Sequence, residues 1–185
     1  MTVCISTSSP YVSVALVERG AVVASASQPG LRNASWVALD LYRQLLAKAG
    51  ASESGSDLYV ADTGPGSFIG VRIATTLAKT LAFAQGKPCA AVSSFDLIAP
   101  DRIVAFPSKR GEWFVRVPGE APFRTALLPK EATGYGPGMA AETYPDAAKA
   151  ANLTLTPLEP VALMPFYGIE PSISVPKTPY RAAEA

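Results

Sequence analysis

The residues with the most chemical potential lie in the stretch 62–74, DTGPGSFIGVRIA. A carboxylate, Asp62, comes directly before a turn that contains Gly64 and Gly66, and a capping hydroxyl, Ser67, follows. Glycine permits positive φ angles and close backbone approach, and free N–H groups at a helix N-terminus attract anions. The pattern therefore predicts either a plain strand-to-helix turn or a weak anion site. It is not a P-loop, because no Gly-Lys-Ser/Thr ending follows.

The composition excludes several kinds of catalytic and metal site. The chain of 185 residues has no histidine, which excludes His-ligated metal sites and Ser-His-Asp or Cys-His catalytic groups. Its two cysteines, Cys4 and Cys89, are too few for a zinc-thiolate site or a disulfide framework, so we expect no bound metal. Sixteen basic and fifteen acidic residues give a net charge of +1, which does not indicate independent binding to nucleic acid.

The lengths of the apolar stretches indicate the cellular compartment to expect. The first residues show no basic region followed by an apolar run of signal-peptide length. The longest mostly apolar stretch, 73–84, is well short of the ~20 residues that span a bilayer. We therefore expect a cytoplasmic protein with reduced thiols and no contact with a membrane.

The distribution of proline predicts two lobes. Only three of the 17 prolines precede position 88, so residues 1–100 can hold long elements, whereas residues 101–185 must form a smaller lobe of short ones. Periodicity and turn signals predict strands at 2–6, 11–17, 21–27, 57–62 and 88–92 in the first lobe. Helices are predicted from a cap at Asn33 or Ser35 to 49, at 67–86 and at 93–99. The second lobe has predicted strands at 102–106, 112–117 and 122–127 and short helices at 147–151 and 160–166.

The two long predicted helices carry more apolar surface than one sheet requires. The second helix has a stripe of small residues spaced four apart: Gly70, Ala74, Ala78 and Ala82. It also has an aliphatic face that we expect to lie on the sheet: Ile73, Leu77, Leu81 and Ala84. Small side chains allow another helix to approach closely. Two interpretations stay open: the helices bury these faces against each other, or they also meet a second subunit.

The glycine turn resembles a family motif. The motif is G-P-G-S-F-T-G-x-R-x-G of the bacterial TsaB (YeaZ) family, and the matched positions are Gly64, Pro65, Gly66, Ser67, Phe68, Gly70 and Arg72. Weaker matches lie at 5–8, 13–16, 86–88, 92–95, 134–136 and 179–181, so the resemblance covers residues 1–100 well and the remainder loosely. It implies an α/β fold of the actin-like ATPase class (acetate kinase, Hsp70, actin), with two lobes and a shortened second lobe.

The departures from the family pattern all remove polar chemistry. Ser6 stands where the family's first strand usually ends in an aspartate, and Ile69 replaces the motif threonine. In actin-like ATPases that aspartate helps to hold the metal of a bound nucleotide. This chain therefore resembles a family member with even less capacity for catalysis.

The resemblance implies a non-catalytic partner subunit for a TsaD-like synthase that forms threonylcarbamoyladenosine (t6A) on tRNA. It implies contact with tRNA only through the complex, a TsaE-like ATPase as a further partner, and a homodimer when the chain is alone. No cofactor is expected to bind tightly, and ATP or ADP would lie weakly at a lobe or subunit interface. The weak anion-binding residues would be Thr7, Ser8, Gly64, Gly66 and Ser67. The partner interface would be Trp36, Leu39, Arg43, Gly70, Arg72, Ala74, Ala78, Lys79 and Ala82.

Two other functions stay open from the residues. The first is a small kinase-like enzyme of the same fold, in which Asp62 would be the carboxylate near the γ-phosphate and its Mg²⁺. The second is a structural homodimer without a role in tRNA modification. ATP turnover by the chain alone would favour the enzyme, and a second intact copy in the genome would favour the structural dimer.

Overall fold

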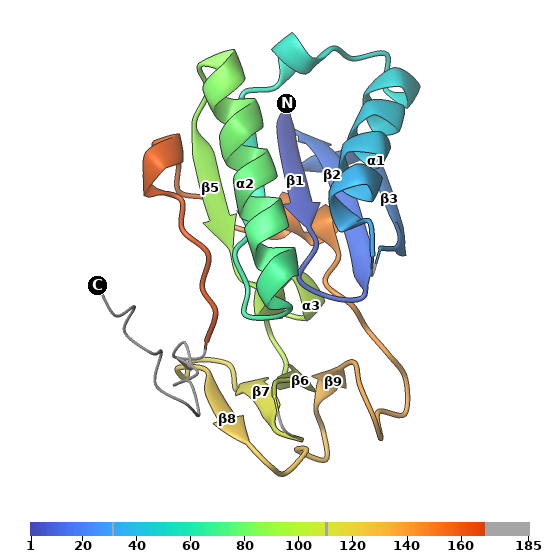
Figure 1. Cartoon of the computed structure of the whole chain (residues 1–185), viewed down its shortest axis with the longest axis vertical. Coiled ribbons are helices and arrows are strands. Elements are labelled where there is room, and N and C mark those ends of the chain that lie inside the picture. The colour runs from blue at the N-terminus through green and yellow to red at the C-terminus, as the bar shows by residue number, and fades with distance from the viewer. Residues whose placement is uncertain (31, 110, 169–185) are drawn as a thin grey trace, which may run out of the picture.

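The computed structural model describes residues 1–30, 32–109 and 111–168. The weak family match at 179–181 and the end of the predicted second lobe lie outside the described residues. Two sheets, one above the other in Figure 1, form the framework, and α1 and α2 cover the upper sheet on the side facing the viewer. No helix within the described ranges has the length and apolar character needed to cross a membrane.

The upper sheet has five strands in the order β3-β2-β1-β4-β5. Its strands are β1 (Thr2–Ser6), β2 (Tyr11–Glu18), β3 (Ala21–Pro29), β4 (Leu58–Asp62) and β5 (Cys89–Val92). The first three pair antiparallel, and β4 and β5 run parallel to β1. Because β1 and β4 are parallel neighbours, Ser6 and Asp62 end their strands at the same edge of the sheet. The five strands that the sequence predicts all form.

Alternation along the strands builds a core on each face of this sheet. Val3 and Ile5 pack beneath α1 (Ala34–Lys48) and α2 (Phe68–Gln85), whereas Cys4 faces the opposite side. The 3₁₀ helix η2 (Ala147–Asn152) covers that opposite side. Cys4 and Cys89 are buried free thiols, they lie in different core clusters, and β4 separates their strands.

The helices begin and end where local chemistry favours it. Ser67 Oγ accepts a hydrogen bond from the Gly70 amide and caps α2, and Gly86 ends it in the left-handed conformation with φ 60°. Ser93 Oγ accepts from the Phe95 amide at the start of α3 (Ser94–Ile98). Asn33 precedes α1 without a side-chain cap. The short helices predicted near 147 and 160 form as the 3₁₀ helices η2 and η3 (Pro160–Ala162) rather than as α-helices.

The lower sheet has the strand order β8-β7-β6-β9. Its strands are β6 (Val104–Pro107), β7 (Trp113–Arg116), β8 (Phe123–Thr125) and β9 (Thr133–Gly134), of which β9 was not predicted. The chain then returns to the upper sheet, since Ala147 and Ala150 pack behind it and Leu163 is fully buried in the core under α1 and α2. The lobe boundary near residue 100 stays a prediction, but the segment 147–163 does not lie with the lower sheet.

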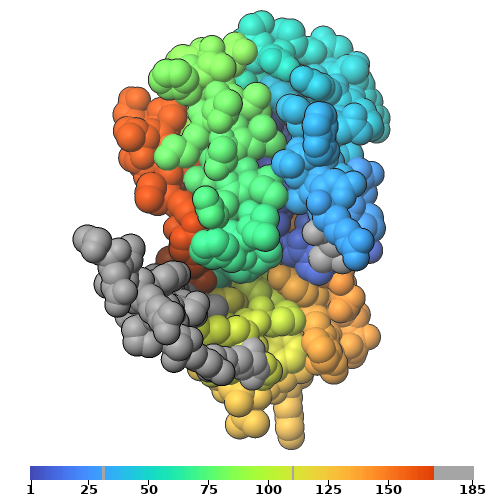
Figure 2. Space-filling model, in the orientation of Figure 1, coloured from blue at the N-terminus to red at the C-terminus, as the bar shows by residue number. Residues whose placement is uncertain are grey.

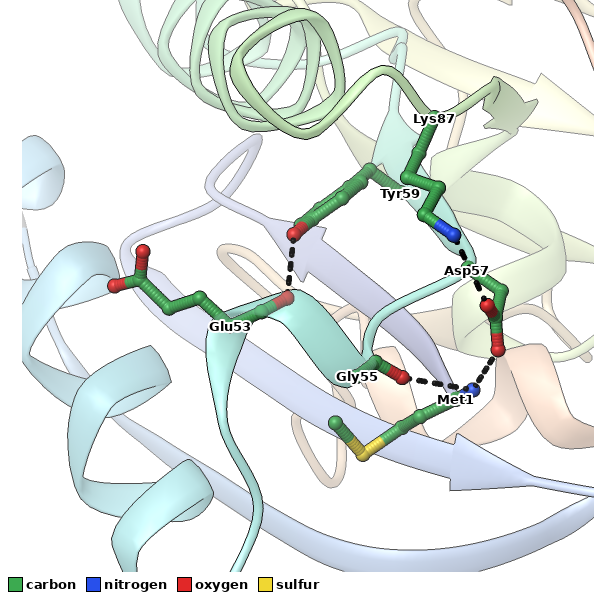
Figure 3. Close-up of polar contacts among 6 residues, drawn as sticks. All are labelled: Met1, Glu53, Gly55, Asp57, Tyr59 and Lys87. Carbon is green, nitrogen blue, oxygen red and sulfur yellow. Dashed lines mark hydrogen bonds and ion pairs between the residues drawn. The ribbon is translucent and has the colours of Figure 1, made fainter.

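An ion-pair cluster holds Met1, the residue directly before β1 (Figure 3). The Met1 amino group donates to Asp57 Oδ2 at 2.5 Å and to the Gly55 carbonyl at 3.3 Å, and Lys87 Nζ lies 3.4 Å from Asp57 Oδ1. The Met1 amino group and Lys87 hold the pKa of Asp57 below its ordinary value. The cluster therefore connects the start of β1 to the loops before β4 and β5.

Candidate functional site

The carboxylate of Asp62 is enclosed by hydroxyl groups at the edge where β1 and β4 end. Ser6 Oγ and Ser8 Oγ donate to Asp62 Oδ2, each at 2.6 Å, and Ser94 Oγ donates to Oδ1 at 2.6 Å. The Gly64 amide also donates to Oδ1, at 2.9 Å. Asp62 and the three serines are at most 1% exposed, so the group is closed to solvent.

Four donors satisfy this carboxylate and leave it little chemical freedom. Burial raises the pKa of Asp62, and the hydrogen bonds from the serines and from Gly64 lower it in part. A buried polar group without partners costs free energy, and here each carboxylate oxygen has two donors. Ser6, which departs from the family pattern, is therefore a partner of Asp62, and Asp62 connects β1, β4 and α3.

The residues predicted to hold an anion bond within the chain instead. Thr7 Oγ1 donates to the Gly70 carbonyl at 2.6 Å, and the Ser67 amide donates to the Ser8 carbonyl at 2.7 Å. A Cβ at Gly66 would lie 2.5 Å from the Ser8 carbonyl oxygen, so this glycine serves close packing. Because the Ser8 hydroxyl and the Gly64 amide both bond to Asp62, these two groups are not free to bind a nucleotide phosphate. Weak binding of ATP or ADP at a lobe or subunit interface stays a prediction.

A cavity of about 500 Å³ lies between the turn and the lower sheet. Residues that the sequence analysis did not select line it, among them Arg32, Tyr135, Glu142 and Tyr144. Glu142 Oε2 accepts a hydrogen bond from the Tyr144 hydroxyl at 2.6 Å, and Tyr144 stacks on Tyr135 with ring centroids 4.8 Å apart. More than 100 positions separate Arg32 from Tyr135, so only the weak match at 134–136 pointed to this wall. No group of three or more Cys, Asp or Glu side chains suited to a metal occurs in the described ranges.

The predicted orientation of α2 is wrong. The small-residue stripe faces the sheet: Gly70, Ala74, Ala78 and Ala82 are all buried. A Cβ at Gly70 would lie 1.9 Å from the Thr7 carbonyl oxygen, and the three alanines belong to the same core cluster as the large side chain of Tyr59. Small residues are needed because α2 lies close to strands with large side chains. These four residues therefore cannot meet a partner.

The aliphatic face of α2 instead borders an open groove beside α1. The groove has a volume of about 520 Å³, and we call it the α1–α2 groove. Its lining residues are Ser35, Trp36, Leu39, Ile69, Arg72, Ile73, Thr76, Leu77 and Thr80. Trp36 is 74% exposed and Ile69 is 70% exposed. Figure 2 shows this seam between the blue surface of α1 and the green surface of α2.

The other predicted interface residues divide between the groove and the chain itself. Arg72 lines the groove, with its guanidinium 5.5 Å from the centre of the Phe68 ring, and Arg43 lies exposed on α1 beside Trp36 and Leu39. Lys79 turns away, because its amine donates to the Leu163 carbonyl at 3.1 Å and thereby fastens the segment after η3 to α2. Trp36, Leu39, Arg43 and Arg72 are therefore the predicted interface residues that the structure leaves available.

Comparisons with known proteins agree with this fold. A family model described as TsaD, tRNA N6-adenosine threonylcarbamoyltransferase, matches residues 28–107. The tRNA threonylcarbamoyladenosine biosynthesis protein TsaB of Bacillus subtilis is 36% identical over 95 residues, which cover 51% of this chain and 42% of that protein. The match thus spans about two fifths of the relative's length.

Solved structures extend the likeness to most of the chain. The structure of YeaZ from Pseudomonas aeruginosa superposes with a TM-score of 0.72 at 23% identity, covering 90% of this chain and 98% of that chain. A second structure from that organism, of an uncharacterized protein with similarity to peptidase YEAZ, gives the same TM-score at 22% identity over the same shares of the two chains. These neighbours confirm the α/β actin-like fold. The glycine-turn motif, the curated relative and these structures thus all make the chain similar to the TsaB (YeaZ) family.

Proposed function

We propose that the chain is a non-catalytic subunit that supports a TsaD-like synthase in forming threonylcarbamoyladenosine on tRNA. The names of the matched family model and of the Bacillus subtilis relative support a role in this modification. In this proposal the synthase carries the chemistry and its metal, tRNA is contacted through the complex, and a TsaE-like ATPase is a further partner. The observation that carries the proposal is the α1–α2 groove.

The groove has the character of a docking surface. Exposed apolar side chains from two helices gather along it, including Trp36 and Ile69, and a large contiguous apolar surface on a protein marks an interaction site. Phe83, further along α2, is 82% exposed. A few aromatic residues, tryptophan among them, contribute most of the binding energy in many protein interfaces, and an exposed tryptophan beside an aliphatic groove fits that role.

The buried environment of Asp62 at the glycine turn favours a supporting role over catalysis. Asp62 is the best-placed carboxylate for a kinase-like reaction, but it is buried and bonded to four donors. A carboxylate that holds Mg²⁺ or accepts a proton needs access to the substrate. Asp62 is therefore not the accessible carboxylate that the kinase-like alternative requires of it.

Reconstitution with the host's TsaD-like protein tests the proposal. The two proteins should co-purify, and t6A should form on tRNA only when both are present with the remaining components. Ile69→Glu places a charge in the groove and should abolish co-purification and t6A formation. Leu127→Glu is the matched control, because Leu127 is an exposed aliphatic residue near the lower sheet, and it should change neither. Absence of binding by the wild-type chain, or t6A formation by this chain alone, would contradict the proposal.

A further inference from the structure

The two helices that border the groove concentrate positive charge. Together they contain four cationic side chains and one carboxylate: Arg43, Lys48, Arg72, Lys79 and Asp40. That is a net charge of +3, whereas the whole chain carries +1, so the other residues together carry −2. Of these side chains, Arg72 lines the groove and Arg43 lies exposed beside it, whereas Lys79 bonds to the segment after η3, so the positive charge at the groove comes from the two arginines.

Within residues 1–30, 32–109 and 111–168, no carboxylate forms an ion pair with these cations. None of the ion pairs found in the described residues involves α1 or α2. Asp40 accepts a hydrogen bond from the Gln44 amide at 2.7 Å rather than pairing with an arginine. Arg72 lies over the Phe68 ring, which holds the guanidinium beside the apolar lining without cancelling its charge.

A second copy of the chain would meet this face with the same charges. A two-fold symmetric dimer through the groove applies one surface to itself, so cations gather on both sides of the interface. Within a Debye length, about 10 Å at 0.1 M salt, such charges repel, and like charges across an interface act against a wrong partner. The apolar groove favours self-association, and Arg43 and Arg72 oppose it.

We infer that Arg43 and Arg72 are specificity residues that select a partner with an apolar, acidic-rimmed docking face over a second copy of this chain. The inference rests on the proposed function and names the chemistry of the partner's docking face. That face presents apolar side chains that fill the groove and carboxylates that meet the two guanidinium groups. Arginine suits this task because its planar fork binds a carboxylate through two hydrogen bonds and stays charged at all physiological pH values.

Salt gives the first test, because the two associations respond in opposite directions. Binding of the chain to the TsaD-like protein should weaken by about tenfold in Kd as NaCl rises from 50 to 500 mM. Self-association, followed by analytical ultracentrifugation over the same range, should strengthen. Complex formation without salt dependence would overturn the inference and leave the proposed function intact, whereas absence of binding at any salt would overturn both.

Charge reversal gives the second test. The double variant R43E/R72E should bind the TsaD-like protein about tenfold or more weakly at low salt, and it should pair with the wild-type chain more strongly than either pairs with itself. Lys130→Glu is the control, since it makes the same kind of charge change at an exposed position outside α1 and α2, and it should change neither. Circular dichroism checks that the double variant folds. Undiminished partner binding, or mixed pairing no stronger than wild-type self-pairing, would overturn the inference.

Discussion

The cleft at the glycine turn and the α1–α2 groove differ in how their side chains are used. In the cleft Asp62, Thr7 and Ser8 have their polar atoms bonded to other parts of the chain. In the groove Trp36 and Ile69 present most of their surface to solvent. Most of the residues that match the family motif lie at the glycine turn, but the exposed side chains that are free to contact another molecule lie in the groove. In this chain the motif serves the architecture, and the surface that it helps to place is available for function.

The two regions are physically connected. Gly70 lies at the base of α2, where a Cβ would strike the Thr7 carbonyl, and the next residues along the helix line the groove. The hydroxyls around Asp62 hold β1, β4 and α3 together at that same point. The cleft therefore determines where α2 lies on the sheet, and the groove follows from that position. Variants that separate stability from binding test this division.

The largest expected effect is the loss of the Asp62 carboxylate. Asp62→Ala leaves three serine hydroxyls and the Gly64 amide without their acceptor in a closed site, and hydrogen bonds to charged groups contribute roughly 1.5–3 kcal/mol each. We expect the free energy of unfolding to fall by about 3–5 kcal/mol, measured by urea denaturation. Leu127→Ala, at an exposed position, is the control and should stay within about 0.5 kcal/mol of wild type. A stable Asp62→Ala variant would show that the carboxylate is not structural.

A smaller effect is expected where α2 meets the sheet. Ala78 is fully buried, so Ala78→Leu adds three carbon atoms to a packed core and should cost about 1–3 kcal/mol. Ala84→Leu, on an exposed position of the same helix, should change stability by less than about 0.5 kcal/mol. Thermal unfolding measures both. If Ala78→Leu kept its melting temperature but lost binding to the TsaD-like protein, the small-residue stripe would be an interface after all.

The pH dependence of Asp62 is a further test of the cleft. Burial raises its pKa above the unfolded value of about 3.9, so the folded state holds this proton to higher pH than the unfolded state does. Its contribution to stability is complete below the unfolded pKa and decreases as pH rises through the folded pKa. The destabilisation caused by Asp62→Asn should therefore be larger at pH 3.5 than at pH 7, measured by denaturant titration at each pH. A cost that grows with pH would mean that the hydroxyls lower this pKa overall.

Local signals were sufficient for the elements of the upper sheet. The strands and α1, α2 and α3 form where alternation, capping serines and terminating glycines predict them, because each signal acts within a few residues. The turn at Gly64 was also identified, but its partners were not. Ser94 reaches Asp62 across 32 positions, and only the parallel arrangement of β4 and β5 brings them together.

The orientation of α2 shows why the groove could not be predicted in detail. The helix has a small-residue stripe and an aliphatic face, and periodicity alone does not say which of the two meets the sheet. The strands decide, because β4 contributes the large side chain of Tyr59 to the core, and the α2 residues in the same core cluster are the small Ala74, Ala78 and Ala82. Tertiary packing likewise brings the segment 147–163 back to the upper sheet, although the distribution of proline predicts it in the second lobe.

The smallest change in stability is expected for a substitution in the groove, and it is best compared with a substitution in the wall of the cavity beside the glycine turn. Trp36 is 74% exposed, so Trp36→Ala should alter the free energy of unfolding by no more than about 0.5 kcal/mol. Tyr135→Ala, in the cleft wall, removes a ring that is 8% exposed and stacks on Phe106 and Tyr144, and it should cost about 3–5 kcal/mol. Urea denaturation compares the two, and co-purification with the TsaD-like protein should then fail for Trp36→Ala although its fold is intact. Equal losses of stability in the two variants would mean that Trp36 supports the fold, and the groove would lose its separate status as a binding surface.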